Sequence, residues 1–174
     1  MAPGRTEKIN SAIPNRETTK MNAPTQPLQH HHKHCDEIFA DAEALAHAGD
    51  WAACATACAK FGGELEAHFA TEEQVLFPAF EAATGMSGGP TQIMRMEHAQ
   101  MRDLLAQMDA ALQQKNRDAF AGIADTLLIM MQQHNMKEEN ILYPMCDNSL
   151  AGAGLDVEGA LRQRLEGACP ATTS

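Results

Sequence analysis

The sequence predicts an all-α protein folded as an antiparallel, up-down-up-down four-helix bundle. Alanine, leucine and methionine are abundant and only 5% of the residues are aromatic, a composition that favours helix over sheet. Four segments carry apolar residues in alternating steps of three and four, which is the spacing of one helical face. The connections between these segments are short, as they are between antiparallel neighbours in a bundle.

Composition limits the class of protein further. A chain of 174 residues with 44% apolar residues suits one domain with one core. The net charge of −10 leaves no basic stripe for a phosphate backbone, so nucleic acid is not an expected partner. No run approaches the roughly 18 apolar residues of a membrane span, and the N-terminus lacks the apolar core of a secretion signal. We therefore expect a cytoplasmic protein with reduced cysteines.

The first element is a tail followed by a helix. Residues 1–27 carry four prolines and no apolar period, which predicts disorder. The first helix is expected from about Leu28 to Ala48, where Gly49 provides a suitable C-terminal cap.

This helix opens with a histidine-rich run, QHHHKHCD. His31 and His32 each lead an apolar stripe and either can face the core, so the sequence leaves both open. His30 and His34 fall off both stripes and are expected to be solvated. A purification-like metal-binding tract is an alternative reading, but the run opens an amphipathic helix instead of ending a tail.

The second helix is expected to begin after Asp50, a good N-cap residue, and to end at Pro78. Its inward stripe mixes apolar residues with one histidine and one glutamate. The stripe reads Cys54, Cys58, Phe61, Leu65, His68, Glu72 and Val75.

The third and fourth helices follow a turn at residues 83–90, ATGMSGGP. In the third, His98 is the one polar member of the stripe Met94, His98, Met101, Leu105, Met108 and Leu112. The fourth is expected from about Asn116 to Leu142, with Pro144 ending it, and carries the stripe Phe120, Ala124, Leu127, Met131, His134, Glu138 and Ile141. The four-helix domain is thus predicted over residues 28–145. A glycine-rich link, a short helix near Val157–Leu165 and a tail are expected in residues 146–174.

The second and fourth helices contain the same motif. The stretch HFATEEQVLFPAFE, residues 68–81, returns 66 positions later as HNMKEENILYPMCD, residues 134–147. Each copy places a histidine and a glutamate four residues apart, about 6 Å from each other on one helical face. Burying both carboxylates requires a compensating cation, and no lysine or arginine lies on these stripes. A pair of metal ions would provide it, and imidazole and carboxylate from facing helices are the ligands of di-iron sites.

The segments HFATEEQVLFP, MEHAQM and HNMKEENILYP, preceded by HHHKHCDEIF, resemble the hemerythrin-like family, also called HHE cation-binding domains. The resemblance covers about residues 28–145. It implies a four-helix bundle holding two non-haem iron ions, bridged by two carboxylates and an oxo or hydroxo group. Carried over position by position, the implied ligands are His32 or else His31, His68, Glu72, His98, His134 and Glu138.

Two departures from the family pattern affect this assignment. Members that carry oxygen have HxxxH on the third helix, where this chain has Met94, so one iron is expected to have fewer ligands, with water, Glu97 or another group filling in. Those members place the bridging carboxylate five residues after the fourth-helix histidine, which would be Glu139. The first copy of the motif favours Glu138 instead and ranks Glu139 and Glu73 as hydrogen-bond partners of ligands or as surface charges.

The function expected of such a site is binding of a small diatomic ligand, oxygen or nitric oxide, at a reduced iron with an open coordination position, for storage or sensing. Sensing would require a partner protein, because nothing in the chain resembles a signalling domain. An alternative is a di-iron redox enzyme acting on peroxide or nitric oxide, or an iron donor in iron-centre repair; the position left open by Met94 favours this class. A mononuclear or zinc-loaded structural site is a third reading. We expect a metal-binding protein more than a dedicated enzyme.

Overall fold

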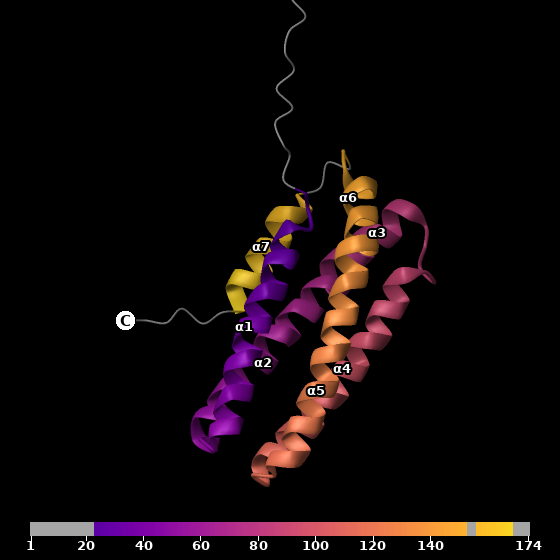
Figure 1. The fold of residues 1–174 in the computed structure, drawn as a ribbon. Helices are drawn as coiled ribbons and strands as arrows, with labels where there is room; N and C mark the ends of the chain where they lie inside the picture. The colour runs from indigo at the N-terminus through magenta and orange to yellow at the C-terminus, as the bar shows by residue number, and fades with distance from the viewer. Residues whose placement is uncertain (1–22, 153–155, 169–174) are drawn as a thin grey trace, which may run out of the picture.

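The computed structural model describes residues 23–152 and 156–168, which contain helices and no strand. Figure 1 shows four long helical rods side by side, which confirms the predicted all-α four-helix bundle. In chain order the elements are α1 (Gln26–Ala48), α2 (Trp51–Thr71), η1 (Glu72–Leu76), α3 (Phe77–Thr84), α4 (Pro90–Gln113), α5 (Arg117–Lys137), η2 (Glu138–Leu142), α6 (Tyr143–Leu150) and α7 (Val157–Ala168).

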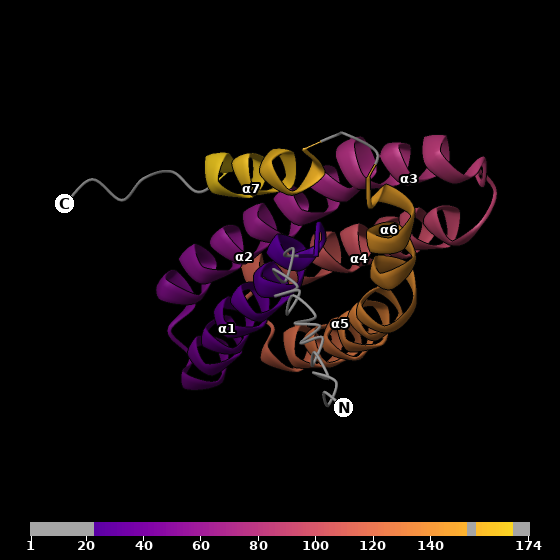
Figure 2. The same ribbon diagram turned by 90° about the horizontal axis from the view of Figure 1, so that it is seen from above.

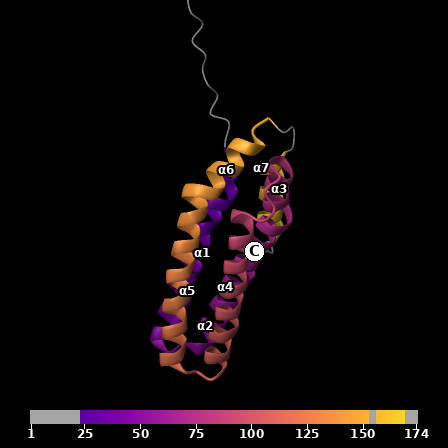
Figure 3. The same cartoon turned by 90° about the vertical axis from the view of Figure 1, so that its right-hand side faces the viewer.

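The chain forms two helical hairpins whose turns lie at the same end of the bundle (Figures 1 and 3). In the first turn Gly49 has φ +78° and caps α1, as predicted. The Asp50 carboxylate accepts a hydrogen bond from the Ala53 amide at 3.1 Å and starts α2. The side chain of Asn116 does the same for the Ala119 amide at the start of α5. Local capping therefore fixes both turns.

The first helix starts slightly earlier than expected. It begins at Gln26, and Thr25 ahead of it is buried. The Thr25 amide and hydroxyl donate hydrogen bonds to the Asp147 carboxylate at 3.0 and 3.1 Å. Residues 1–22 of the predicted tail lie outside the described residues.

Both motif-bearing helices continue past the prolines that were expected to end them. A five-residue π-helical turn, η1 or η2, is followed by α3 or α6, each of which has its proline in the second position. The π turn before each proline widens the continuous helix, which accommodates the missing N–H and the bulk of the proline ring without ending the helix. The prediction that Pro78 and Pro144 end these helices was wrong.

The π turns also move the buried face by one residue. Val75 is only partly buried and Ile141 is 56% exposed, although both were predicted to point inward. The following residues, Leu76 and Leu142, are 0% and 1% exposed. A π turn holds one more residue than an α turn, so the apolar period resumes one position later.

The apolar core lies in two clusters. One fills the end near the hairpin turns and includes Phe39, Phe61 and Leu127. The other lies where α3, α6 and α7 meet the bundle, and includes Met94. The predicted short helix is α7, which packs outside the bundle beside α1 and α2 (Figure 2). No described helix is both long enough and apolar enough to cross a membrane.

Candidate metal centre

Six of the predicted ligand residues meet in one buried cluster. Each of the four rods contributes a histidine, and the two π turns contribute the glutamates. The members are His32 from α1, His68 from α2, Glu72 from η1, His98 from α4, His134 from α5 and Glu138 from η2. This set is called the buried cluster below.

The buried cluster contains two groups whose donor atoms are close enough to hold an ion. In the first, donor atoms of His32, His68 and Glu138 all lie within 4.8 Å of one another. The second group consists of Glu138 again, together with Glu72, His98 and His134. Because Glu138 belongs to both groups, its carboxylate can serve two neighbouring ions.

The Nε2 atoms of the histidines point toward the centre of the cluster. Those of His32 and His68 are 3.1 Å apart, and those of His98 and His134 are 3.2 Å apart. The Nε2 atom of His134 lies 3.0 Å from Glu138 Oε1. Such convergence of imidazole nitrogens and carboxylate oxygens matches the donor set that iron and zinc take in proteins.

The outer nitrogens of the imidazoles are held by further carboxylates. His32 Nδ1 donates to Glu139 Oε1 at 2.7 Å, and His98 Nδ1 donates to Glu73 Oε1 at 2.8 Å. A carboxylate only accepts, so each Nδ1 carries the proton and each Nε2 is left to face a metal. Glu73 and Glu139 therefore lie where hydrogen-bond partners of ligands were expected, and Glu138 faces the centre.

Neither Met94, which stands where oxygen carriers have a further histidine, nor Glu97 belongs to the two donor groups. Met94 is buried in the second apolar cluster. Glu97 does not take a place in either donor group; its carboxylate accepts from His134 Nδ1 at 2.8 Å and pairs with Lys137. The centre therefore has four protein imidazoles and no direct replacement for the fifth among the described residues.

His68 is supported differently from the other three histidines. Its Nδ1 lies 3.3 Å from Nδ1 of His31, whose Nε2 donates to Glu64 Oε2 at 3.1 Å. Since Nε2 of His31 is the donor to Glu64, its Nδ1 accepts from His68. The structure thus separates the two candidates on α1: His32 lies in the cluster and His31 lies behind His68. Sequence reasoning did not find Glu64.

Two carboxylate oxygens in the buried cluster are unpaired. Among the described residues, Glu72 Oε2 and Glu138 Oε1 are buried without a hydrogen bond. The nearest imidazole nitrogens, at 3.2 and 3.0 Å, lack hydrogen-bond geometry. Leaving such atoms unpaired is costly, and a cation between them removes the cost. The residues present therefore fit a metal.

The ionisation of the cluster also favours added positive charge. Burial, together with the charge of Glu138, raises the pKa of Glu72. Burial alone would raise the pKa of Glu138 too, but the adjacent imidazoles of His134 and His32 hold it well below its usual range. Burial lowers the pKa of His68 far below its usual value. Without a metal, the groups of the cluster therefore differ in how readily they bind a proton. A bound metal would keep the ligand atom of each group free of a proton.

Tyr143 is a member of the site that sequence reasoning missed. Its fully buried hydroxyl donates to Glu72 Oε1 at 2.7 Å and lies 3.2 Å from Glu138 Oε2. It also lies 3.3 Å from His32 Nε2. Burial and the two carboxylates raise the pKa of the phenol well above 10, so it stays protonated and can donate. The only signal was LYP in one motif copy where the other has LFP.

The spacing of 66 residues extends beyond the motif to the whole site. Four pairs are identical: His32 and His98, His68 and His134, Glu72 and Glu138, Glu73 and Glu139. Two pairs differ: His31 and Glu97, Phe77 and Tyr143. The two halves of the centre therefore offer the same donors in unlike surroundings.

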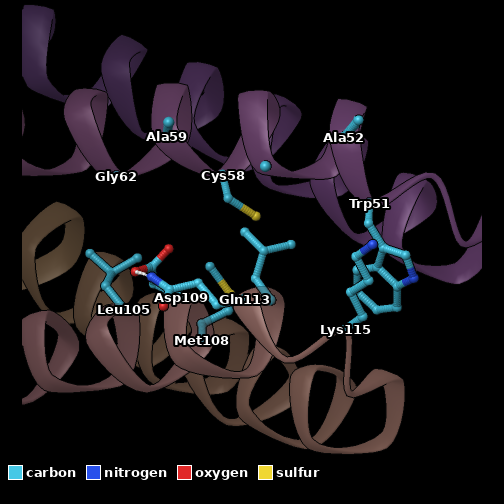
Figure 4. Close-up of a pocket in the computed structure, with 12 residues that line it drawn as sticks. Trp51, Ala52, Cys58, Ala59, Gly62, Leu105, Met108, Asp109, Gln113 and Lys115 are labelled. Carbon is cyan, nitrogen blue, oxygen red and sulfur yellow. Dashed lines mark hydrogen bonds between the residues drawn. The ribbon is translucent and has the colours of Figure 1, made fainter.

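A separate groove of about 530 Å³ lies between α2 and α4, near the hairpin turns. Figure 4 shows Cys58 pointing from α2 across the groove toward α4, whose Leu105, Met108 and Asp109 line the opposite side. None of the six residues of the buried cluster lines this groove. It is therefore distinct from the candidate centre.

Most of the chain matches a family of known proteins. Residues 23–146 match the family model described as the Hemerythrin HHE cation binding domain. No curated protein and no solved structure matches the chain.

Proposed function

The chain belongs to the hemerythrin HHE cation-binding family, and from this premise we propose that its buried cluster holds two non-haem iron ions and binds oxygen or nitric oxide. The observation that carries the proposal is the pair of unpaired glutamate oxygens facing four imidazoles. A reduced iron pair supplies an electron-rich binding place for a diatomic ligand. His32 and His68 would hold one ion, His98 and His134 the other, and the two glutamates would lie between them.

The surrounding side chains orient the imidazoles of this site and exclude water from it. The ring of Phe69 stacks on His98 with the centroids 4.0 Å apart, and the ring of Phe77 stacks 5.9 Å from His98. Apolar clusters cover the buried cluster on both sides. Exclusion of water slows loss of electrons from a reduced metal and keeps polar competitors out. Such surroundings suit reversible binding of a small apolar molecule.

The proposal is tested with reduced protein kept under anaerobic conditions. Metal analysis should give two irons per chain, and addition of oxygen or nitric oxide should produce an absorption band that reverses on removal of the gas. One zinc per chain, with no such band, would overturn the proposal.

Substitutions test which residues bind the metal. His68→Ala and Glu72→Ala should remove most of the iron, because each deletes a central donor. His30→Ala should retain it, because that histidine is exposed. Equal iron loss from all three variants would contradict the assignment.

A redox enzyme is the second candidate function, and the four-histidine centre favours it. With Met94 buried in an apolar cluster, two imidazoles are available for each ion. Fewer protein donors leave room for a second reactant. Sustained peroxide or nitric oxide turnover, or transfer of iron to an acceptor, would support this role over reversible binding.

A further inference from the structure

We propose that His31, His34 and Glu64 form a second, solvent-facing site for one divalent transition-metal ion, which delivers iron to the buried cluster. The site itself follows from residues outside both donor groups of that cluster. Its delivery role rests on the proposed function.

The two oxygens of one carboxylate face two imidazoles. Glu64 is 6% exposed, with Oε2 at 3.1 Å from His31 Nε2 and Oε1 at 3.9 Å from His34 Nε2. The two rings are tilted by 59° with centroids 5.6 Å apart. Two histidines and one carboxylate with remaining open positions are the donor set of mononuclear ferrous sites.

The charge of Glu64 has no full cationic partner. Among the described residues, no lysine or arginine lies within 4.0 Å of its carboxylate, and its ion-pair partners are His31 and His34. A buried carboxylate whose only partners are imidazoles lacks compensation that a divalent ion would supply. The QHHHKHCD run would thus contribute metal ligands besides His32.

Solvent reaches this site through a cavity of about 300 Å³ between α1, α2 and α7. Arg162 and Glu166 of α7 line the same cavity with opposite charges, so α7 adds no net repulsion toward a cation. The donor atoms of His31, His34 and Glu64 do not all lie within 4.8 Å of one another, so binding one ion requires the His34 side chain, which is 41% exposed, to move closer to Glu64. The buried cluster offers no comparably exposed histidine, since its ligands are all buried.

The position of His31 links this site to the centre. Its Nδ1 lies 3.3 Å from His68 Nδ1, so two imidazole rings separate an ion at this site from one in the buried cluster. When His68 binds metal through Nε2, its Nδ1 carries the proton and donates to His31, whose Nε2 then donates to Glu64. In that state His31 Nε2 is not free for a metal. Filling the centre therefore weakens the outer site, as a delivery site requires.

The competing reading is that Glu64 serves only to support His68 through His31. That role requires His31 and Glu64 but not His34, which forms no hydrogen bond or ion pair with the buried cluster among the described residues. Substitution of His34 therefore separates the two readings without touching the centre.

Direct binding is tested with Co²⁺ on the full chain carrying Glu138→Gln, which weakens the centre and leaves the outer site free. The visible absorption of bound Co²⁺ should show a component that is lost on adding His34→Ala or Glu64→Gln. His47→Ala is the matched control, because His47 is an exposed α1 histidine outside this cavity, and it should keep that component. Circular dichroism checks that every variant is folded. Identical Co²⁺ binding with and without His34 would overturn the proposal.

Delivery is tested by the rate of Fe²⁺ uptake into metal-free protein with the natural Glu138. The His34→Ala variant should fill several-fold more slowly and reach the same final iron content. Uptake at the parental rate would overturn the delivery role. Failure of the proposed function would show instead as absence of iron from the parent protein at saturation, which is a separate measurement.

Discussion

The outer partners of the histidines would make the two proposed metal positions chemically different. His134 donates to the carboxylate of Glu97, whereas His68 donates to the neutral ring of His31. A carboxylate partner raises the basicity of an imidazole ligand more than a neutral partner does. The ion held by His98 and His134 would therefore have the more electron-rich donors, and the two ions are expected to differ in reduction potential.

Iron affinity should rise with pH up to about 9. Burial alone would lower the pKa of His134, but the adjacent Glu138 carboxylate raises it to about 9. Below that pH the metal-free imidazole carries a proton that iron must displace, so protons and metal compete. Competition with a chelator under anaerobic conditions at several pH values measures this. Affinity that falls as pH rises through neutrality would contradict it.

Tyr143→Phe should speed iron loss to a chelator by about 10- to 100-fold while the fold is kept. The substitution removes the hydroxyl that donates to Glu72 at 2.7 Å and changes little volume. Met94→Leu is the control, since this residue is buried in the adjacent apolar cluster. Equal rates of iron loss in both variants would show that the phenol does not hold the carboxylates.

The individual ligands could be predicted from sequence to the extent that helical spacing decides them. The histidine and glutamate of each motif copy share one face because four residues make about one turn. His31 and His32 could not be separated, because adjacent positions at a helix start both border the core. Tyr143 and Glu64 were missed, since their roles depend on contacts between different helices, which apolar spacing along one helix does not reveal.

At the scale of elements, the π turns decide which residues are buried. Leu142→Ala should lower the free energy of unfolding by roughly 2–5 kcal/mol, because a buried side chain leaves a cavity. Ile141→Ala should change it by about 0.5 kcal/mol or less, because that side chain is 56% exposed. Urea unfolding of the metal-free proteins measures both. The opposite ranking would mean that the helix keeps α spacing through this segment.

Helix starts and caps could be predicted because they depend on neighbouring residues. Asp50 and Gly49 illustrate this, since each acts within three or four residues of its own position. The π turns could not be predicted from apolar spacing, which assumes a constant period. Pro78 and Pro144 were misread for the same reason: they follow an irregular turn that makes their position harmless.

At the scale of the whole molecule, the centre joins the two hairpins. The first donor group takes His32 and His68 from one hairpin and Glu138 from the other, and the second takes Glu72 across to His98 and His134. Any ion bound there connects both halves. The bundle class was predictable from periodicity and short turns. The packing of α7 against α1 and α2 was not, because the spacing of apolar residues in α7 does not show which helices its buried face contacts.

Removing the metal should lower the melting temperature by an amount that depends on metal concentration. An ion that binds only the folded state at 100 times its Kd adds about 2.7 kcal/mol of stability. Thermal unfolding with and without a chelator, at several metal concentrations, measures this. A melting temperature that is unaffected by the chelator would show that the hairpins associate without help from the centre.

Because the donor residues recur 66 positions apart, two copies of a single hairpin would present a complete set of ligands across a twofold axis. A duplicated and fused gene gives the same layout with one added freedom: the halves can diverge. His31 opposite Glu97, and Tyr143 opposite Phe77, are divergences that a homodimer cannot have, since its halves share one sequence. Fusion of two hairpins into one chain thereby allows the two proposed metal positions to differ. One position can favour binding of the diatomic ligand, and the other can favour uptake of the metal ion.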